Sequence, residues 1–221
     1  DHLDKPKTTV YDHLETLSEL EFVVATADGT YEIGPRFLDF GGYARNRMKI
    51  YQVGKPEIRD LAMSTGEQTN ILIEEHGRGV YLYTFKGEDA VQLDTYAGLH
   101  VPLQTTALGK AILSRLPRSR VEAIVDRHGM PAITENTITE RDELLEELET
   151  IRERGYATDE GERVEGMRCI AAPITDSNDS PIGAISVSGP KNRIRDERFY
   201  EEIPNKVLRA ANVIEVNITF S

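Results

Sequence analysis

The strongest constraint on the fold is a short amphipathic helix that leads directly into a β-hairpin. Residues 6–20 begin with proline and repeat apolar residues at spacings of four and three, which predicts a helix with one apolar face. The strand-like segments 22–26 and 30–33 then flank an Asp-Gly pair, the dipeptide typical of a tight hairpin turn. A helix followed at once by a hairpin is typical of the second half of a winged helix-turn-helix.

The rest of the chain alternates predicted helices with predicted strands. The predicted helices cover residues 36–48, 53–65, 108–116, 120–127, 139–153 and 197–216. The predicted strands cover residues 70–87, in two runs around a His-Gly-Arg-Gly turn, then 90–98, and a hairpin over 169–190. This order predicts an α+β fold whose main sheet is largely antiparallel.

Composition excludes several classes of protein. The net charge of the 221 residues is −12, which argues against nonspecific coating of nucleic acid, because phosphate binding needs a positive field. The single cysteine, Cys169, excludes an internal disulfide framework and a thiolate zinc cluster. No apolar run approaches the roughly 20 residues of a membrane span, and the first ten residues lack the apolar core of a signal peptide. We expect an acidic globular protein of the cytoplasm, with no metal, cofactor or membrane partner.

The charged residues also suggest a salt-rich environment. Arginine occurs 18 times and lysine 8 times, while residues 1–50 hold six basic and nine acidic residues. The acid is therefore spread through the whole chain, and only the tip of the first helix is locally basic. A carboxylate-rich surface whose self-repulsion is screened by salt favours a halophilic protein.

Six segments, in order, carry a family resemblance. They are P-K-T-T-V-Y with the L-x-x-L that follows it, Y-E-I-G-P-R-F-L-D-F-G, V-P-L-Q-T-T-A-L-G-K-A, I-R-E-R-G-Y-A-T-D, G-M-R-C-I-A-A-P-I and P-I-G-A-I-S-V-S-G-P. Through them the chain resembles the IclR family of transcription regulators over nearly its whole length. The resemblance implies a partial winged helix-turn-helix over residues 1–34, a linker helix over 35–50 and a GAF/PAS-like effector domain over 51–221. It also implies a homodimer or dimer of dimers that binds double-stranded operator DNA and responds to a small molecule.

The chain departs from the family pattern at two places. Family members usually carry another helix pair before the recognition helix, whereas this chain begins almost at Pro6, so we expect only half of a DNA-binding domain. Asp12 and His13 stand where relatives often have arginine and leucine. An acidic group there weakens phosphate attraction, or accepts a hydrogen bond from cytosine N4.

The resemblance assigns the start of the first helix to DNA. A recognition helix enters the major groove with its N-terminus first, so its first two turns meet bases and phosphates. The predicted contacts are Lys5, Lys7, Thr8, Thr9 and Tyr11. The alternative is that the two threonines only cap or solvate a helix start.

The resemblance also maps an effector pocket onto the second half of the chain. The predicted lining residues are Leu93, Ala107 and Leu108 on one wall and Asp159, Met167, Cys169, Ser186 and Ser188 on the other. Alternate residues of a strand share a face, and the serine hydroxyls with the backbone amides near residues 107–109 could hold the carboxylate of an organic acid or sugar-derived metabolite.

Each polar residue of this pocket has a simpler interpretation. The serines could be the polar face of an exposed strand, and Cys169 could be a small buried hydrophobe. Asp159 could accept a hydrogen bond from an effector hydroxyl or only anchor its loop. Lys110 and Arg168 are the nearby cations, and either could face solvent instead.

Two other functions remain open at this point. An enzyme with Cys169 as nucleophile would need a histidine beside it, and no phosphate loop, G-x-S-x-G or metal-spaced histidine pair supports catalysis. A stand-alone sensor or partner-binding module without DNA binding is the other alternative, which the early start and the acidic charge would suit.

Overall fold

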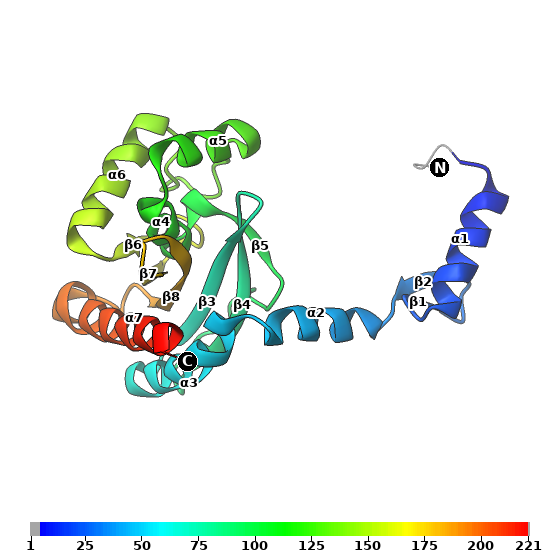
Figure 1. The fold of residues 1–221 in the computed structure, drawn as a ribbon, viewed down its shortest axis with the longest axis horizontal. Helices are drawn as coiled ribbons and strands as arrows, with labels where there is room; N and C mark the ends of the chain where they lie inside the picture. The colour runs from blue at the N-terminus through cyan, green and yellow to red at the C-terminus, as the bar shows by residue number, and fades with distance from the viewer. Residues whose placement is uncertain (1–4, 221) are drawn as a thin grey trace. The chain divides into compact units, whose positions relative to one another are not determined.

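The computed structural model describes residues 5–220 of the chain (Figure 1). These residues form two compact units, of which the first ends at Met48 and the second begins at Lys49. Each unit has its own secondary structure, and the two are described separately below.

The first unit contains the predicted helix and hairpin. Its elements are α1 (Lys7–Glu19), β1 (Val23–Ala25), β2 (Tyr31–Ile33) and α2 (Arg36–Asn46). The strands pair antiparallel with Val24 opposite Glu32. Gly29 takes a φ of +82° in the turn, where Asp28 accepts hydrogen bonds from both flanking threonines. The helix-then-hairpin expectation for residues 6–33 is confirmed.

Aromatic rings join α2 to the hairpin. The ring centroid of Phe22 lies 5.2 Å from that of Phe37 and 5.6 Å from that of Phe40. The guanidinium of Arg36 lies 5.3 Å from the centre of the same Phe22 ring. Phe37 and Phe40 nevertheless stay half exposed, so this contact is a small cluster and not an enclosed core.

The second unit is built on one six-stranded sheet. Its helices are α3 (Lys49–Thr65), the short η1 (Leu103–Thr105), α4 (Ala107–Arg115), α5 (Arg118–His128), α6 (Arg141–Arg154), η2 (Arg198–Glu202) and α7 (Ile203–Phe220). Its strands are β3 (Gln68–Glu75), β4 (Arg78–Lys86), β5 (His100–Pro102), β6 (Ala157–Asp159), β7 (Met167–Thr175) and β8 (Pro181–Pro190). The strand order is β5-β4-β3-β8-β7-β6, with every neighbouring pair antiparallel. The predicted antiparallel effector-domain sheet is therefore present.

Helices cover both faces of this sheet. Figure 1 shows α3 and α7 together on one side and α4, α5 and α6 on the other. On the first side the Thr69 hydroxyl donates to the Ile58 carbonyl at 2.9 Å, and Gly54 leaves room for the side chain of Ile71. On the other side Leu72, Leu108 and their neighbours form a continuous buried cluster. Burial of this apolar area is the main stabilising contribution to the unit.

Some predicted boundaries change. Residues 90–98 form turns and extended coil instead of a strand, and the edge strand β5 follows at His100. The alternation of apolar residues in 90–98 suggested a strand, but Gly98 has a φ of +95° and turns the chain before it pairs with β4. Helix α3 begins at Lys49 rather than Val53, and the last helix continues to Phe220 after a π-helical first turn.

Candidate functional site

The register of the sheet places four side chains in one row across neighbouring strands. Gln68 on β3 lies opposite Ser188 on β8, Ser188 lies opposite Cys169 on β7, and Cys169 lies opposite Asp159 on β6. Because residues in register share a face, these four point to the side covered by α4. The row lies at the end of the sheet where β3 begins.

The composition of the rows changes along this face. The next row inward holds Asn70, Ser186 and Ala171, and the one after it holds Leu72 and Ala184. The face is thus polar at one end and apolar in its middle, where it packs against α4. Polar side chains buried at the end of a sheet need partners, which makes this end the candidate site.

The polar row lies at a small cavity that also borders the start of α4 and two loops. The cavity is lined by Gln68, Asn70, Tyr81, Leu93, Thr95, Thr106, Leu108, Asp159, Arg163, Val164, Met167, Arg168, Cys169 and Ser188. Its free volume is about 30 Å³, which is room for one or two water molecules. A bound metabolite therefore requires the lining to move outward.

A hydrogen-bond network connects the buried polar residues. The Asn70 amide nitrogen donates to the hydroxyl oxygens of Ser186 at 3.1 Å and Ser188 at 3.4 Å. The Thr84 hydroxyl donates to the Asn70 amide oxygen at 3.1 Å, and the Ser188 hydroxyl donates to the Cys169 sulfur at 3.1 Å. Both serines are buried, so the interpretation as an exposed polar strand face is wrong.

Asp159 fixes the loop that follows β6. Its Oδ1 accepts a hydrogen bond from the backbone amide of Glu162 at 2.7 Å, and the amides of Gly161 and Arg163 also hydrogen-bond to its carboxylate. Burial raises the pKa of Asp159, and these amides together with Lys110 oppose that shift. The carboxylate is thus engaged in anchoring its own loop, the second of the two roles considered above.

Lys110 lies behind the cavity and does not face solvent. Its side chain is 2% exposed, and its Nζ lies 2.5 Å from Glu162 Oε1 and 3.8 Å from Glu147 Oε1. Burial raises the pKa of Glu162 to about 7. Lys110 is therefore committed to a buried ion pair, and its expected role as an available cation for an anionic effector is not supported.

Arg163 and Arg168 border the cavity differently. Arg168 follows Met167 with its side chain on the α7 side, where it pairs with Glu160 at 2.6 Å and stacks 4.2 Å from the ring centre of Phe199. Arg163 reaches over Tyr81 and pairs at 3.0 Å with Asp94, whose side chain is 77% exposed. Arg163 is thus the lining cation whose carboxylate partner is easiest to replace.

Cys169 has the properties of a structural thiol. Burial raises its pKa to about 12, and the nearby Asp159 carboxylate acts in the same direction. A nucleophilic cysteine needs a lowered pKa and a neighbouring base, whereas no histidine lines the cavity within residues 5–220. The geometry gives no support to the enzyme alternative.

The structure brings six of the eight predicted effector residues to this cavity. Ala107 instead lies fully buried in the apolar cluster under α4, and Ser186 lies one row behind the cavity. The amide of Gly109 is taken by the Thr106 hydroxyl that caps α4, at 2.9 Å, so it is not free for a carboxylate as we expected. Sequence reasoning missed Gln68, Asn70 and Arg163. The Gln-x-Asn alternation at the start of a buried strand is a signal that could have found the first two.

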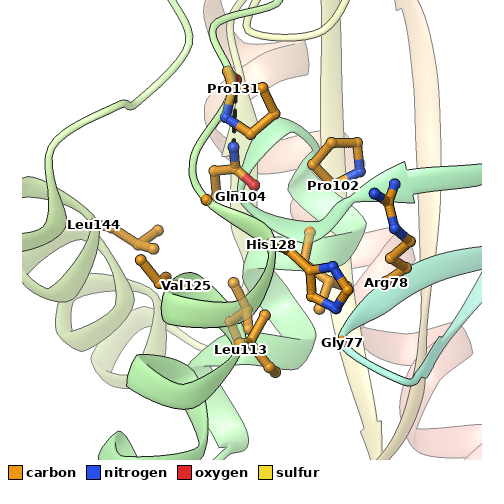
Figure 2. Close-up of a pocket in the computed structure, with 12 residues that line it drawn as sticks. Gly77, Arg78, Pro102, Gln104, Leu113, Val125, His128, Pro131 and Leu144 are labelled. Carbon is orange, nitrogen blue, oxygen red and sulfur yellow. Dashed lines mark hydrogen bonds between the residues drawn. The ribbon is translucent and has the colours of Figure 1, made fainter.

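A second hollow, at the other end of the sheet, has a different character (Figure 2). It is larger, at about 100 Å³, and its lining is mostly apolar, with Leu113, Val125 and Leu144 around it. Two of its polar side chains are engaged within the chain: the Gln104 amide donates to the Pro131 carbonyl, and His128 Nε2 lies 2.8 Å from the carbonyl oxygen of His76. We place the candidate site at the smaller cavity because a row of buried polar side chains converges there with Arg163, whose ion-pair partner Asp94 is exposed.

The predicted DNA contacts lie on the open face at the start of α1. Lys5, Lys7 and Thr8 are exposed, Tyr11 is 66% exposed and Thr9 is half buried. Pro6 occupies the N-cap without a side-chain cap, and the first turn holds no acidic residue. Neither threonine caps this helix, so the capping half of the alternative is wrong, whereas the other half, a solvated helix start, agrees with the exposure of Thr8. An uncapped, locally basic helix start favours a negatively charged group.

A winged-helix segment joined to a ligand-binding sheet unit defines a class of ligand-responsive transcription regulators. Residues 43–216 match the model of the bacterial transcriptional regulator IclR C-terminal domain. The chain belongs to the IclR family.

Named relatives agree with this class. The chain is 35% identical over 219 residues to the probable HTH-type transcriptional regulator ArcR of Halobacterium salinarum, covering 98% of this chain and 83% of that protein. The crystal structure of the Thermotoga maritima IclR matches with a TM-score of 0.82 and 30% identity, covering 96% of this chain and 86% of that one. An IclR homologue complexed with 4-hydroxybenzoate, from Microbacterium hydrocarbonoxydans, has the same fold at a TM-score of 0.82 and 20% identity, with 96% and 86% covered.

The chain is thus a DNA-binding transcription regulator of a family that is not enzymatic, which agrees with the expected absence of catalysis. Regulators of this family bind operator DNA and small-molecule effectors and are typically oligomeric. Within residues 5–220, none of the helices combines the length and the apolar character that a membrane crossing requires.

Proposed function

We propose that this regulator binds operator DNA through the start of α1 and senses a small organic acid or sugar-derived metabolite at the cavity beside β3. The proposal assigns DNA contact to residues 1–34, a linking role to 35–50 and effector binding to 51–221. The proposed assembly is a homodimer or dimer of dimers, acting in the cytoplasm, where its operator lies. Two-fold pairs of recognition helices read pseudo-palindromic sites.

The observation that carries the effector proposal is the position of Arg163. Arg163 lines the cavity with 14% of its side chain exposed, while the side chain of its partner Asp94, on the 90–98 segment, is 77% exposed. A carboxylate on the effector can replace Asp94 without leaving a buried charge unpaired, and the displaced aspartate returns to water at little cost. The same exchange moves the 90–98 segment outward and enlarges the cavity.

We further propose that this acidic regulator works in high salt. The relative from Halobacterium salinarum and the net charge of −12 support it. High salt screens repulsion between the acidic body and DNA, so only the small basic tip of α1 needs to meet phosphate.

Ligand binding to the full chain tests the effector site. We expect lactate or 4-hydroxybenzoate to raise the melting temperature, because a ligand bound only by the folded state stabilises it, and Arg163→Gln to weaken that binding at least about tenfold. Arg118→Gln, at an arginine whose side chain is 71% exposed, is the matched control and should bind like the parent. Equal binding by both variants would remove Arg163 from the site.

A competition shift assay tests the DNA part. The full-length protein should prefer a pseudo-palindromic operator over random DNA, and binding should persist near molar salt. No sequence preference at high or low salt would favour the stand-alone sensor instead.

A further inference from the structure

Gln68 is a buried polar side chain of the cavity that is incompletely paired. It is 1% exposed, opens strand β3 and lines the cavity beside Ser188. Its amide nitrogen donates to the Asn70 Oδ1 at 3.2 Å. Its Oε1, by contrast, is buried and meets no hydrogen-bond donor in the described part of the chain.

The hydrogen bonds of the neighbouring residues agree with this orientation of the Gln68 amide. The Asn70 nitrogen already donates to Ser186 and Ser188, so the Asn70 oxygen is the atom that faces Thr84 and Gln68. Turning the Gln68 amide over would set its oxygen against the Asn70 oxygen, acceptor against acceptor. With its nitrogen on Asn70, the carbonyl oxygen is the end of the Gln68 amide that is left without a donor.

An unpaired buried carbonyl oxygen is unfavourable, and a partner that donates a hydrogen bond recovers the loss. Leu93, Leu108 and Met167 offer no acceptor to such a partner, and the Asp159 carboxylate is already engaged by the amides of its own loop. Accurately placed polar groups in a ligand site fix the orientation of the ligand and set its specificity.

We propose that Gln68 Oε1 is the specificity-determining acceptor of this site, and that it selects effectors that carry a hydroxyl donor in addition to a carboxylate. The hydroxyl donates to Gln68 and the carboxylate pairs with Arg163, which defines the effector class as small hydroxy acids. This inference rests on the proposed effector site and adds the chemistry that the site distinguishes.

Matched pairs of acids test the selection directly. The probes are lactate with propionate, glycolate with acetate and 4-hydroxybenzoate with benzoate, each titrated calorimetrically into the full chain. A site built around a hydrogen-bonding group discriminates strongly against the analogue that lacks it, so the hydroxylated member of a binding pair should bind at least about tenfold tighter. Since this measurement needs only the parent protein, it does not depend on the folding of any variant.

Gln68 variants then assign the preference to this residue. Gln68→Met keeps the length of the side chain but removes the acceptor, and should bring the two members of a pair to within about twofold of each other. Gln104→Met changes another buried glutamine, outside this cavity, and should leave the preference unchanged.

The outcomes separate this inference from the proposed function. Equal binding of both members by the parent, or an undiminished preference in Gln68→Met, overturns the inference and leaves the effector site in place, with Oε1 satisfied by water alone. Failure of every probe to bind the parent overturns the proposed organic-acid site, and the inference with it.

Discussion

The two units differ in how much of their apolar surface they bury themselves. Among residues 5–48 only Gly34 is buried, and neither α1 nor α2 contains a buried side chain. The second unit encloses a continuous cluster under α4 and a second layer between the sheet and the α3–α7 pair. Large side chains such as Ile33, Leu38 and Tyr43 are at least 73% exposed in the first unit. The second unit therefore contributes most of the folding stability, whereas the side chains of the first unit stay accessible to solvent or to a partner.

This difference matches two kinds of recognition. A helix that reads DNA must keep its polar side chains accessible, whereas a metabolite site needs a buried sheet end where few polar groups converge. The following predictions test the contrast, from the largest expected effect to the smallest.

Glu67 should be the most sensitive charged position. Its side chain is 1% exposed, and it pairs with Arg193 at 2.6 Å and Arg198 at 3.4 Å. Glu67→Ala leaves two arginines without their buried partner and should lower the unfolding free energy by about 3–5 kcal/mol. Urea unfolding of the full chain measures the change. The exposed Glu32 of the first unit is the control, and Glu32→Ala should stay within about 0.5 kcal/mol of the parent.

Equivalent leucine truncations should differ sharply between the units. Leu72→Ala removes a fully buried side chain from the sheet and should destabilise the chain by about 2–5 kcal/mol. Leu38 on α2 is 76% exposed, so Leu38→Ala should change stability by at most about 0.5 kcal/mol. Similar losses at both positions in thermal unfolding would contradict the assignment of stability to the second unit.

The buried Glu162 makes stability depend on pH. Because burial raises its pKa from 4.5 to about 7, the folded chain holds a proton that the unfolded chain has released over this range. Its contribution to stability is fully present below pH 4.5 and is lost as the pH rises through about 7. Asp159, with its raised pKa, acts in the same direction, while Lys110 opposes both shifts.

Glu162→Gln tests this sign. The variant should lose part of the decline in unfolding free energy that the parent shows between pH 5 and 8, measured by urea unfolding at several pH values. The exposed Glu143 of α6 provides the control, since Glu143→Gln should follow the parent curve. A decline in the Glu162 variant as steep as in the parent would show that this carboxyl does not titrate as described.

Lys7 should contribute a small electrostatic effect confined to DNA. Its removal as Lys7→Gln should weaken binding about equally for all sequences and reduce the slope of log affinity against log salt by about 1. The same change at the exposed Lys191 of the second unit should leave the slope unchanged. Loss of sequence preference in Lys7→Gln would instead indicate a base contact.

Much of the fold could be predicted because its local signals agree with its packing. Apolar spacing located most of the helices, and Asp28-Gly29 located the hairpin of the first unit. The prediction of a strand over residues 90–98 is wrong because the alternation of apolar residues does not show whether the edge of a neighbouring strand is free to pair. The turn at Gly98 and the hydrogen bonds of Arg163 to the segment set its conformation. Both features involve residues that are distant in the sequence.

The candidate site was less predictable for a similar reason. Alternation within β7 and β8 correctly grouped Cys169 with Met167 and Ser188 with Ser186, but which row meets the cavity depends on the register between strands. Lys110 looked available in the sequence, and only its distance to Glu162 shows that it is paired. Buried polar positions of this kind require the tertiary structure.

Glu67 and Gln68 are neighbours in the chain but take part in two different features of the structure. Gln68 lines the cavity, whereas Glu67 accepts hydrogen bonds from Arg193 and Arg198. Arg198 also donates to the backbone carbonyl of Thr65 at the end of α3. Gly189 is required next to this cluster, since a Cβ there would come within 2.4 Å of Glu67. Only two residues, Gly66 and Glu67, lie between the end of α3 and Gln68 at the cavity. We therefore expect a ligand that displaces Gln68 to disturb the ion pairs of Glu67 or the end of α3.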